Sequence, residues 1–144
     1  MNKKKIVGID FGTVRIGMAL SDDLKLIARP LAPILAQKSL EKTAELLGRE
    51  LNTYGPLEVI VVGLPLFLSG KDSPLSLQVR TLAASLEKSL SIPVILWDER
   101  LTTLQVERAL KEQEMSRKQR AGIVDSKAAA AILQNYLDSA AFRH

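Results

Sequence analysis

Three carboxylates, Asp10, Glu99 and Asp125, occur in parts of the sequence that are otherwise apolar. Asp10 interrupts the apolar segment 5–11, Glu99 closely follows the apolar segment 93–97, and Asp125 lies at helical spacing from apolar residues of the last predicted helix. A buried charge needs a hydrogen-bond donor or a cation to offset its lost hydration. Taken singly, each acid also fits a cap, an ion pair or a structural turn. Taken together, they predict one site built from three acids.

Carboxylate oxygens are the ligands that hard divalent cations such as Mg²⁺ or Mn²⁺ prefer. A cation held in this way polarises a phosphodiester, lowers the pKa of an attacking water and steadies the leaving oxygen. We therefore predict that Asp10, Glu99 and Asp125 are catalytic residues and metal ligands. Asp98 stays open as a ligand in place of Glu99, because strand alternation points these two neighbours in opposite directions.

Composition excludes several other kinds of catalytic site. The chain of 144 residues has no Cys, and its one His is the final residue, His144. Thiol nucleophiles, disulfides, His/Cys zinc clusters and a Ser-His-Asp triad are therefore excluded. The formal net charge of +4 permits an anionic partner. The longest apolar stretch, 59–68, is too short to cross a membrane and contains a Pro, which favours a cytoplasmic protein.

The hydropathy pattern predicts alternating strands and helices in one domain, 1–144. We predict strands over 5–11, 15–21, 27–35, 59–63 and 93–97, and helices from Ser39 to Gly55-Pro56, from Ser73-Pro74 to Leu90, from Thr102 to Gln113 and over 125–142. Pro30 and Pro33 favour an edge position for the third strand, because Pro cannot donate to a strand ladder. This order predicts an α/β fold, with a mixed five-stranded sheet and helices packed on both faces.

Five basic residues are candidates for contacts with nucleic-acid phosphates, because guanidinium and ammonium groups bind phosphate oxygens. They are Arg15, Arg100, Arg117, Lys118 and Arg120. Arg15 also fits an exposed charge on a hairpin, and Arg100 fits an ion pair with Asp98 or Glu99. The aromatic residues, Phe67 among them, fall mostly in predicted core elements, which favours recognition of backbone and shape over base stacking.

Four motifs together resemble the YqgF/RuvX family. They are GIDFGTVRIGMALSD (8–22), VGLP (62–65), DERLTT (98–103) and VDSKAAAAIL (124–133), in the family's order and spread over nearly the whole chain. The resemblance implies a ribonuclease H-like fold and places the family's acids at Asp10, Glu99 and Asp125. The chain departs from the family at Ser69-Gly70, where Asp-Gly is common.

The family is described as Holliday junction resolvases or as nucleases that mature the 5′ end of pre-16S rRNA. We therefore expect a nuclease dependent on Mg²⁺ or Mn²⁺, acting on pre-rRNA in ribosome biogenesis. One alternative is a resolvase that cuts branched DNA in recombination, which would favour a homodimer over a monomer. A second alternative is a non-catalytic ribosome assembly factor that binds nucleic acid. GIDFGT also resembles the phosphate-binding opening of actin-like ATPases, but those need two such lobes.

Overall fold

The computed structural model describes residues 4–101 and 126–141. Several sequence predictions lie outside the described residues: the helix from Thr102 to Gln113, the acid Asp125, and the basic residues Arg117, Lys118 and Arg120.

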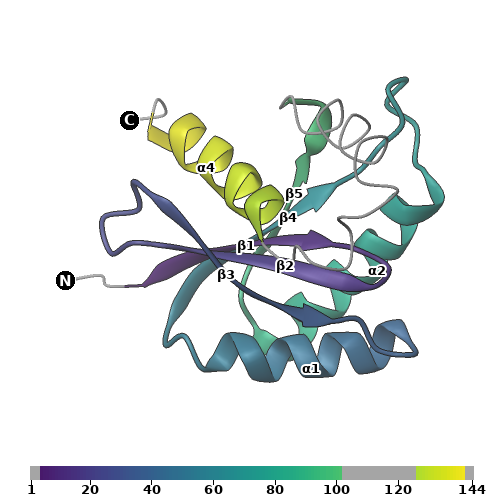
Figure 1. The fold of residues 1–144 in the computed structure, drawn as a ribbon, viewed down its shortest axis with the longest axis horizontal. Helices are drawn as coiled ribbons and strands as arrows, with labels where there is room; N and C mark the ends of the chain where they lie inside the picture. The colour runs from purple at the N-terminus through teal and green to yellow at the C-terminus, as the bar shows by residue number, and fades with distance from the viewer. Residues whose placement is uncertain (1–3, 102–125, 142–144) are drawn as a thin grey trace, which may run out of the picture.

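Five strands form one mixed sheet in the order β3-β2-β1-β4-β5 (Figure 1). Their bounds are β1 Lys5–Phe11, β2 Arg15–Ser21, β3 Ala28–Leu35, β4 Leu57–Leu64 and β5 Val94–Asp98. The first three strands pair antiparallel, whereas β1, β4 and β5 run parallel. The predicted mixed five-stranded sheet is confirmed, and each predicted strand overlaps an observed one.

The third strand lies at an edge of the sheet, as its two prolines predict. β3 pairs with β2, and Pro30 lies opposite Ala19 in this ladder. Because Pro lacks an N–H, it is tolerated where one side of the strand faces no further strand. The opening meander β1-β2-β3 therefore fills one half of the sheet, and β1 lies at its centre.

Helices cover both faces of the sheet (Figure 1). α1 Leu40–Asn52 and α2 Pro74–Leu90 pack on one face, and α4 Lys127–Ala141 packs on the other. Ser39 caps α1 by accepting a hydrogen bond from the backbone N–H of Lys42, and Ser73 forms a capping box at the start of α2. Both caps stand at the predicted helix starts. The prediction of helices on both faces is confirmed.

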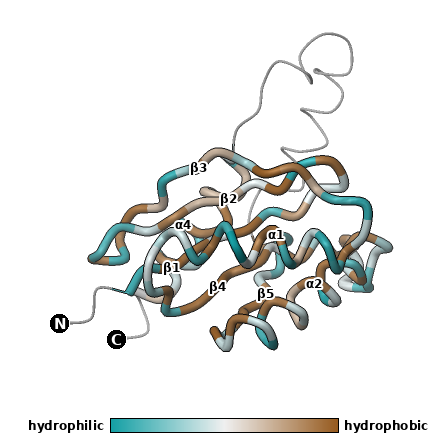
Figure 2. Tube along the Cα trace, turned by 90° about the horizontal axis from the view of Figure 1, so that it is seen from below, coloured by the Kyte–Doolittle hydropathy of each residue, from teal (hydrophilic) through white to brown (hydrophobic). Residues whose placement is uncertain are grey.

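Most residues of the central strands are hydrophobic (Figure 2). Because their side chains alternate between the two faces of the sheet, the described residues form one hydrophobic core on each face. Val7, Ile9 and Phe11 belong to the core beneath α1 and α2, and Ile6 belongs to the core beneath α4. Because successive residues of a strand face opposite sides, Asp10 lies on the α4 face.

Ser126, just before α4, hydrogen-bonds the backbone of the sheet. It is 1% exposed, and its Oγ accepts a hydrogen bond from the backbone N–H of Met18 (2.9 Å) and donates one to the carbonyl of Leu31 (2.7 Å). These contacts lie where the β2–β3 register shifts between Ile16 and Met18. One hydroxyl therefore serves backbone groups of two strands at an irregularity in their ladder.

We expect Ser126→Ala to lower the free energy of unfolding by about 1–3 kcal/mol, because it leaves a buried N–H and a carbonyl without this partner. Chemical denaturation monitored by circular dichroism measures the change. Ser85→Ala is the matched control, since Ser85 is exposed on α2. Equal stability of the two variants would contradict a stabilising role for the hydrogen bonds of Ser126.

Candidate active site

Asp10 lies near the carboxyl end of the central strand β1. It pairs with Gly17 of β2, and the adjacent residue Ile9 pairs with Val62 of β4. The next residue of each strand, Asp10 and Gly63, therefore lies at the same level of the sheet. The carboxyl edge of parallel strands is where open α/β sheets bind their ligands.

Glu99 follows β5 directly and opens the 3₁₀-helix η1 Glu99–Leu101. The residue is 1% exposed. A Cβ placed on Gly63 would lie 2.8 Å from Glu99 Oε2 and 2.5 Å from Ile132 Cδ1 of α4. The Glu99 carboxylate therefore occupies the space that any side chain at position 63 would need, on the α4 face of the sheet.

A second glycine brings the start of α4 close to Asp10. A Cβ on Gly17 would lie 3.6 Å from Asp10 Cβ and 3.5 Å from Ser126 Oγ. The side chains of Asp10 and Ser126 thus converge over the same point of β2. Asp125, which precedes Ser126 in the chain, lies outside the described residues.

The structure therefore puts two of the three predicted acids on the same face of the sheet and at the same edge. Gly63 of β4 lies between the two acids. It is level with Asp10 in the sheet, and the Glu99 carboxylate lies over it on the α4 face. Among residues 4–101 and 126–141, no group of three His, Cys, Asp or Glu side chains is arranged to hold a metal ion.

Asp98, the alternative to Glu99, is occupied by Arg100. Arg100 Nε lies 3.1 Å from both Asp98 carboxylate oxygens, and Nη2 lies 2.7 Å from Oδ2. These bonds hold the pKa of the Asp98 carboxyl below its ordinary value. Trp97 packs in the core beneath α4, so alternation turns Asp98 to the opposite face from Glu99.

Two of the five predicted phosphate contacts fall on described residues. Arg15 is exposed at the start of β2, one residue before the Phe11–Ile16 pair, so it stands at the same sheet edge as Asp10. Arg100 stands at this edge as well and is engaged with Asp98. Both roles in phosphate binding remain predictions.

Sequence reasoning missed the glycine beneath Glu99 and the hydroxyl of Ser126. Both belong to the motifs VGLP and VDSKAAAAIL, but their contacts join segments far apart in the chain. Phe67 is an exception to the expectation that the aromatic residues lie mostly in core elements. It is 53% exposed on the turn after β4, where its carbonyl accepts a hydrogen bond from the backbone N–H of Gly70.

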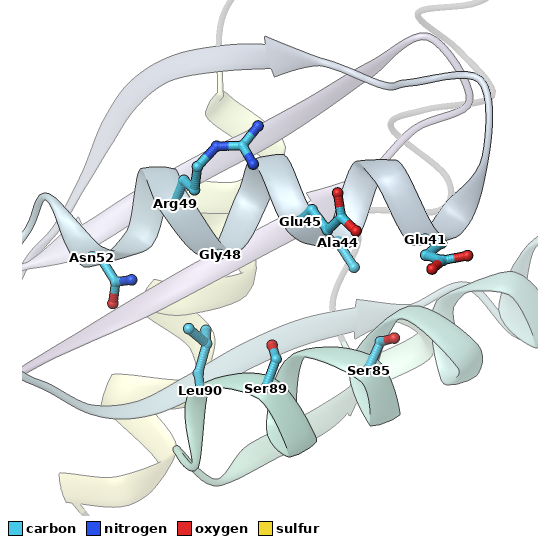
Figure 3. A pocket seen from close by; sticks show the side chains of 9 residues that line it. All are labelled: Glu41, Ala44, Glu45, Gly48, Arg49, Asn52, Ser85, Ser89 and Leu90. Carbon is cyan, nitrogen blue, oxygen red and sulfur yellow. The ribbon is translucent and has the colours of Figure 1, made fainter.

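A cavity of about 350 Å³ lies between α1 and α2 (Figure 3). Glu41, Glu45 and Arg49 line it from α1, and Ser85 and Ser89 line it from α2. These helices cover the face of the sheet opposite α4. The cavity is therefore separate from the Asp10–Glu99 site.

The family model described as "RuvX: Holliday junction resolvase" matches residues 4–139. The chain belongs to the RuvX family. This match confirms the resemblance carried by the four motifs. The RuvX family is a family of nucleases.

Curated relatives match this RuvX protein over almost its whole length. The relative from Protochlamydia amoebophila is 45% identical over 140 residues, which cover 94% of this chain and 93% of the relative. The relative from Halothermothrix orenii is 40% identical over 134 residues, covering 93% and 94%. Both carry the name "Putative pre-16S rRNA nuclease".

Solved structures confirm the fold. Thermus thermophilus RuvC in complex with a Holliday junction substrate aligns with a TM-score of 0.55 at 16% identity, covering 95% of each chain. The fowlpox virus resolvase with Holliday junction DNA aligns with a TM-score of 0.56 at 14% identity, covering 94% of this chain and 98% of the resolvase. The predicted ribonuclease H-like architecture is therefore the RuvC-like fold. Within the described residues, no helix is long and apolar enough to span a membrane.

Proposed function

We propose that this RuvX protein is a metal-dependent nuclease that processes the 5′ end of pre-16S rRNA. The observation that supports the proposal is that Asp10 and Glu99 share the carboxyl edge of β1 and β5 and the face covered by α4. The relatives at 40–45% identity supply the substrate. Ribosomal precursors are made in the cytoplasm, and we infer that the protein acts there.

Asp10, Glu99 and Asp125 are the proposed ligands of Mg²⁺ or Mn²⁺, and the proposed catalytic residues. The carboxylate oxygens of Asp10 and Glu99 suit a hard cation, and the lack of a side chain at Gly63 leaves the space that the Glu99 carboxylate occupies. A bound cation supplies Lewis acidity toward a phosphoryl oxygen and acidifies water. The protein's own contribution is to fix these oxygens on rigid strand ends before the substrate arrives.

Substrate choice is tested by offering two labelled nucleic acids with Mg²⁺ or Mn²⁺. One is a precursor RNA that spans the 5′ end of 16S rRNA, and the other is a four-way DNA junction. We expect cleavage of the RNA by a monomer or a homodimer. Exclusive cleavage of the junction would replace the proposal by the resolvase, which the family description favours. Binding of both without cleavage would replace it by a non-catalytic assembly factor.

Phosphate contacts by Arg15, Arg117, Lys118 and Arg120 are part of the proposal. Neutralising the last three together by Gln should reduce RNA affinity and flatten the slope of log affinity against log salt by up to about 2, since each phosphate contact on a single strand contributes roughly 0.7. Fluorescence anisotropy without a divalent cation measures the slope. Lys88→Gln, an exposed site in the last turn of α2, is the control. An unchanged slope in the triple variant would remove these residues from the interface.

A further inference from the structure

The residues on either side of Glu99 bind each other. Asp98 ends β5 and Arg100 lies in η1, so Glu99 is held between the two members of an ion pair. The backbone N–H of Arg100 also donates to Asp98 Oδ1 at 2.9 Å. Side chain and backbone together close a tight turn around Glu99. The backbone of Glu99 is therefore part of this turn.

Arg100 connects the same turn to the segment that follows β4. Its Nη1 donates to the carbonyl of Leu68 at 3.3 Å. Its guanidinium also covers Gly70, where a Cβ would lie 3.1 Å from Nη1 and where φ is +91°. The segment containing Leu68 and Gly70 begins directly after Gly63-Leu64, against which the Glu99 carboxylate rests.

The Arg100 guanidinium therefore links the turn that carries Glu99 to the segment that follows β4, in which Leu68 lies. The Asp98 carboxylate uses both oxygens for Arg100, and the guanidinium uses all three of its nitrogens for Asp98 and Leu68. A planar fork makes such paired bonds at fixed angles, which a Lys ammonium cannot reproduce.

We propose that the Asp98–Arg100 pair is a clamp that fixes the Glu99 carboxylate over Gly63, with Arg100 acting as a positioning residue. This inference rests on the proposed nuclease function, in which Glu99 holds the cation. It takes Arg100 out of the predicted phosphate contacts and Asp98 out of the possible metal ligands.

The test compares Asp98→Asn, Arg100→Gln and the double variant in the full chain. The readouts are the single-turnover cleavage rate on precursor RNA, the Mn²⁺ affinity by calorimetry without RNA, and the RNA affinity and salt slope without a divalent cation. Groups that orient a ligand from outside a metal centre cost about 10- to 100-fold in affinity or rate when removed. We expect each single variant to lose rate and Mn²⁺ affinity within that range.

The double variant should lose no more than the worse single variant, because the two side chains act as one unit. RNA affinity and its salt slope should stay at the wild-type value in all three. Arg80→Gln is the matched control, because it removes another Arg–Asp ion pair. Arg80 Nε of α2 lies 2.9 Å from Asp72 Oδ1, just before that helix begins. The rate and Mn²⁺ affinity of this variant should equal those of the wild type.

A phosphate-binding Arg100 would give the opposite pattern. Arg100→Gln would weaken RNA binding and flatten the salt slope, whereas Asp98→Asn would strengthen binding by releasing the guanidinium. That pattern, or unchanged Mn²⁺ affinity in both variants, would overturn the clamp. A wild type that binds Mn²⁺ but cuts no RNA would overturn the nuclease function instead, and the Mn²⁺ affinities would still decide the clamp.

Discussion

Glu99→Gln is expected to lower the rate of RNA cleavage by more than about 100-fold. Mutating residues that only orient a metal ligand already lowers metal affinity or activity by about 10- to 100-fold, and Glu99 is a proposed direct ligand. Gln keeps the size of the side chain beside Gly63 and removes the charge that would hold a cation. The cleavage rate at saturating Mg²⁺ is the measurement. Circular dichroism verifies that the variant is folded.

Glu45→Gln is the matched control for the loss of one negative charge, since Glu45 is exposed on α1, away from the α4 face. It should cleave at the wild-type rate. If Glu99→Gln kept more than a tenth of the wild-type rate, the buried carboxylate would have a structural role only.

Gly63→Ala is expected to reduce cleavage by about 100-fold, the cost of misplacing a catalytic group by about 1 Å. The added Cβ would lie 2.8 Å from Glu99 Oε2 and 2.5 Å from Ile132 Cδ1, so both side chains must move. Overpacking of this kind also lowers the free energy of unfolding by about 1–3 kcal/mol. Cleavage rate and denaturant midpoint are measured on the same protein.

A second substitution separates the two effects of the added methyl group. Gly63→Ala combined with Ile132→Val removes the contact with Cδ1 and leaves the contact with Glu99. Stability should rise toward the wild-type value while cleavage stays low. Gly48→Ala is the control, because a Cβ there meets Leu90 Cδ2 at an ordinary 3.7 Å and Ala favours the helix. Recovery of cleavage together with stability would show that Gly63 serves packing alone.

Local sequence signals predict the elements of this fold well. The strand over 5–11 and the Ser39 and Ser73 caps follow from β-branched content and cap chemistry, which act over a few residues. The face of Asp10 follows from its alternation with Ile9 and Phe11 in β1. Such features need no knowledge of which segments meet in space.

Contacts between distant segments are what the sequence could not supply. Glu99 over Gly63, Ser126 on Met18 and Leu31, and Arg100 on Leu68 each depend on the order of strands in the sheet. Alternation predicted that Asp98 and Glu99 face opposite ways but could not say which one faces Asp10. The exposure of Phe67 is not visible in the sequence, because an apolar residue after a buried strand resembles a continuation of that strand.

We propose that Asp10 and Glu99, on one edge of the sheet, hold a divalent cation that supports hydrolysis of a phosphodiester. The most direct measurement maps the 5′ ends released from precursor 16S rRNA by the wild type and by Asp10→Asn in Mg²⁺, with Asp23→Asn as the exposed control. We predict one defined end from the wild type and from Asp23→Asn, and uncut RNA from Asp10→Asn. Release of the same end by Asp10→Asn would rule out a catalytic role for the Asp10 carboxylate.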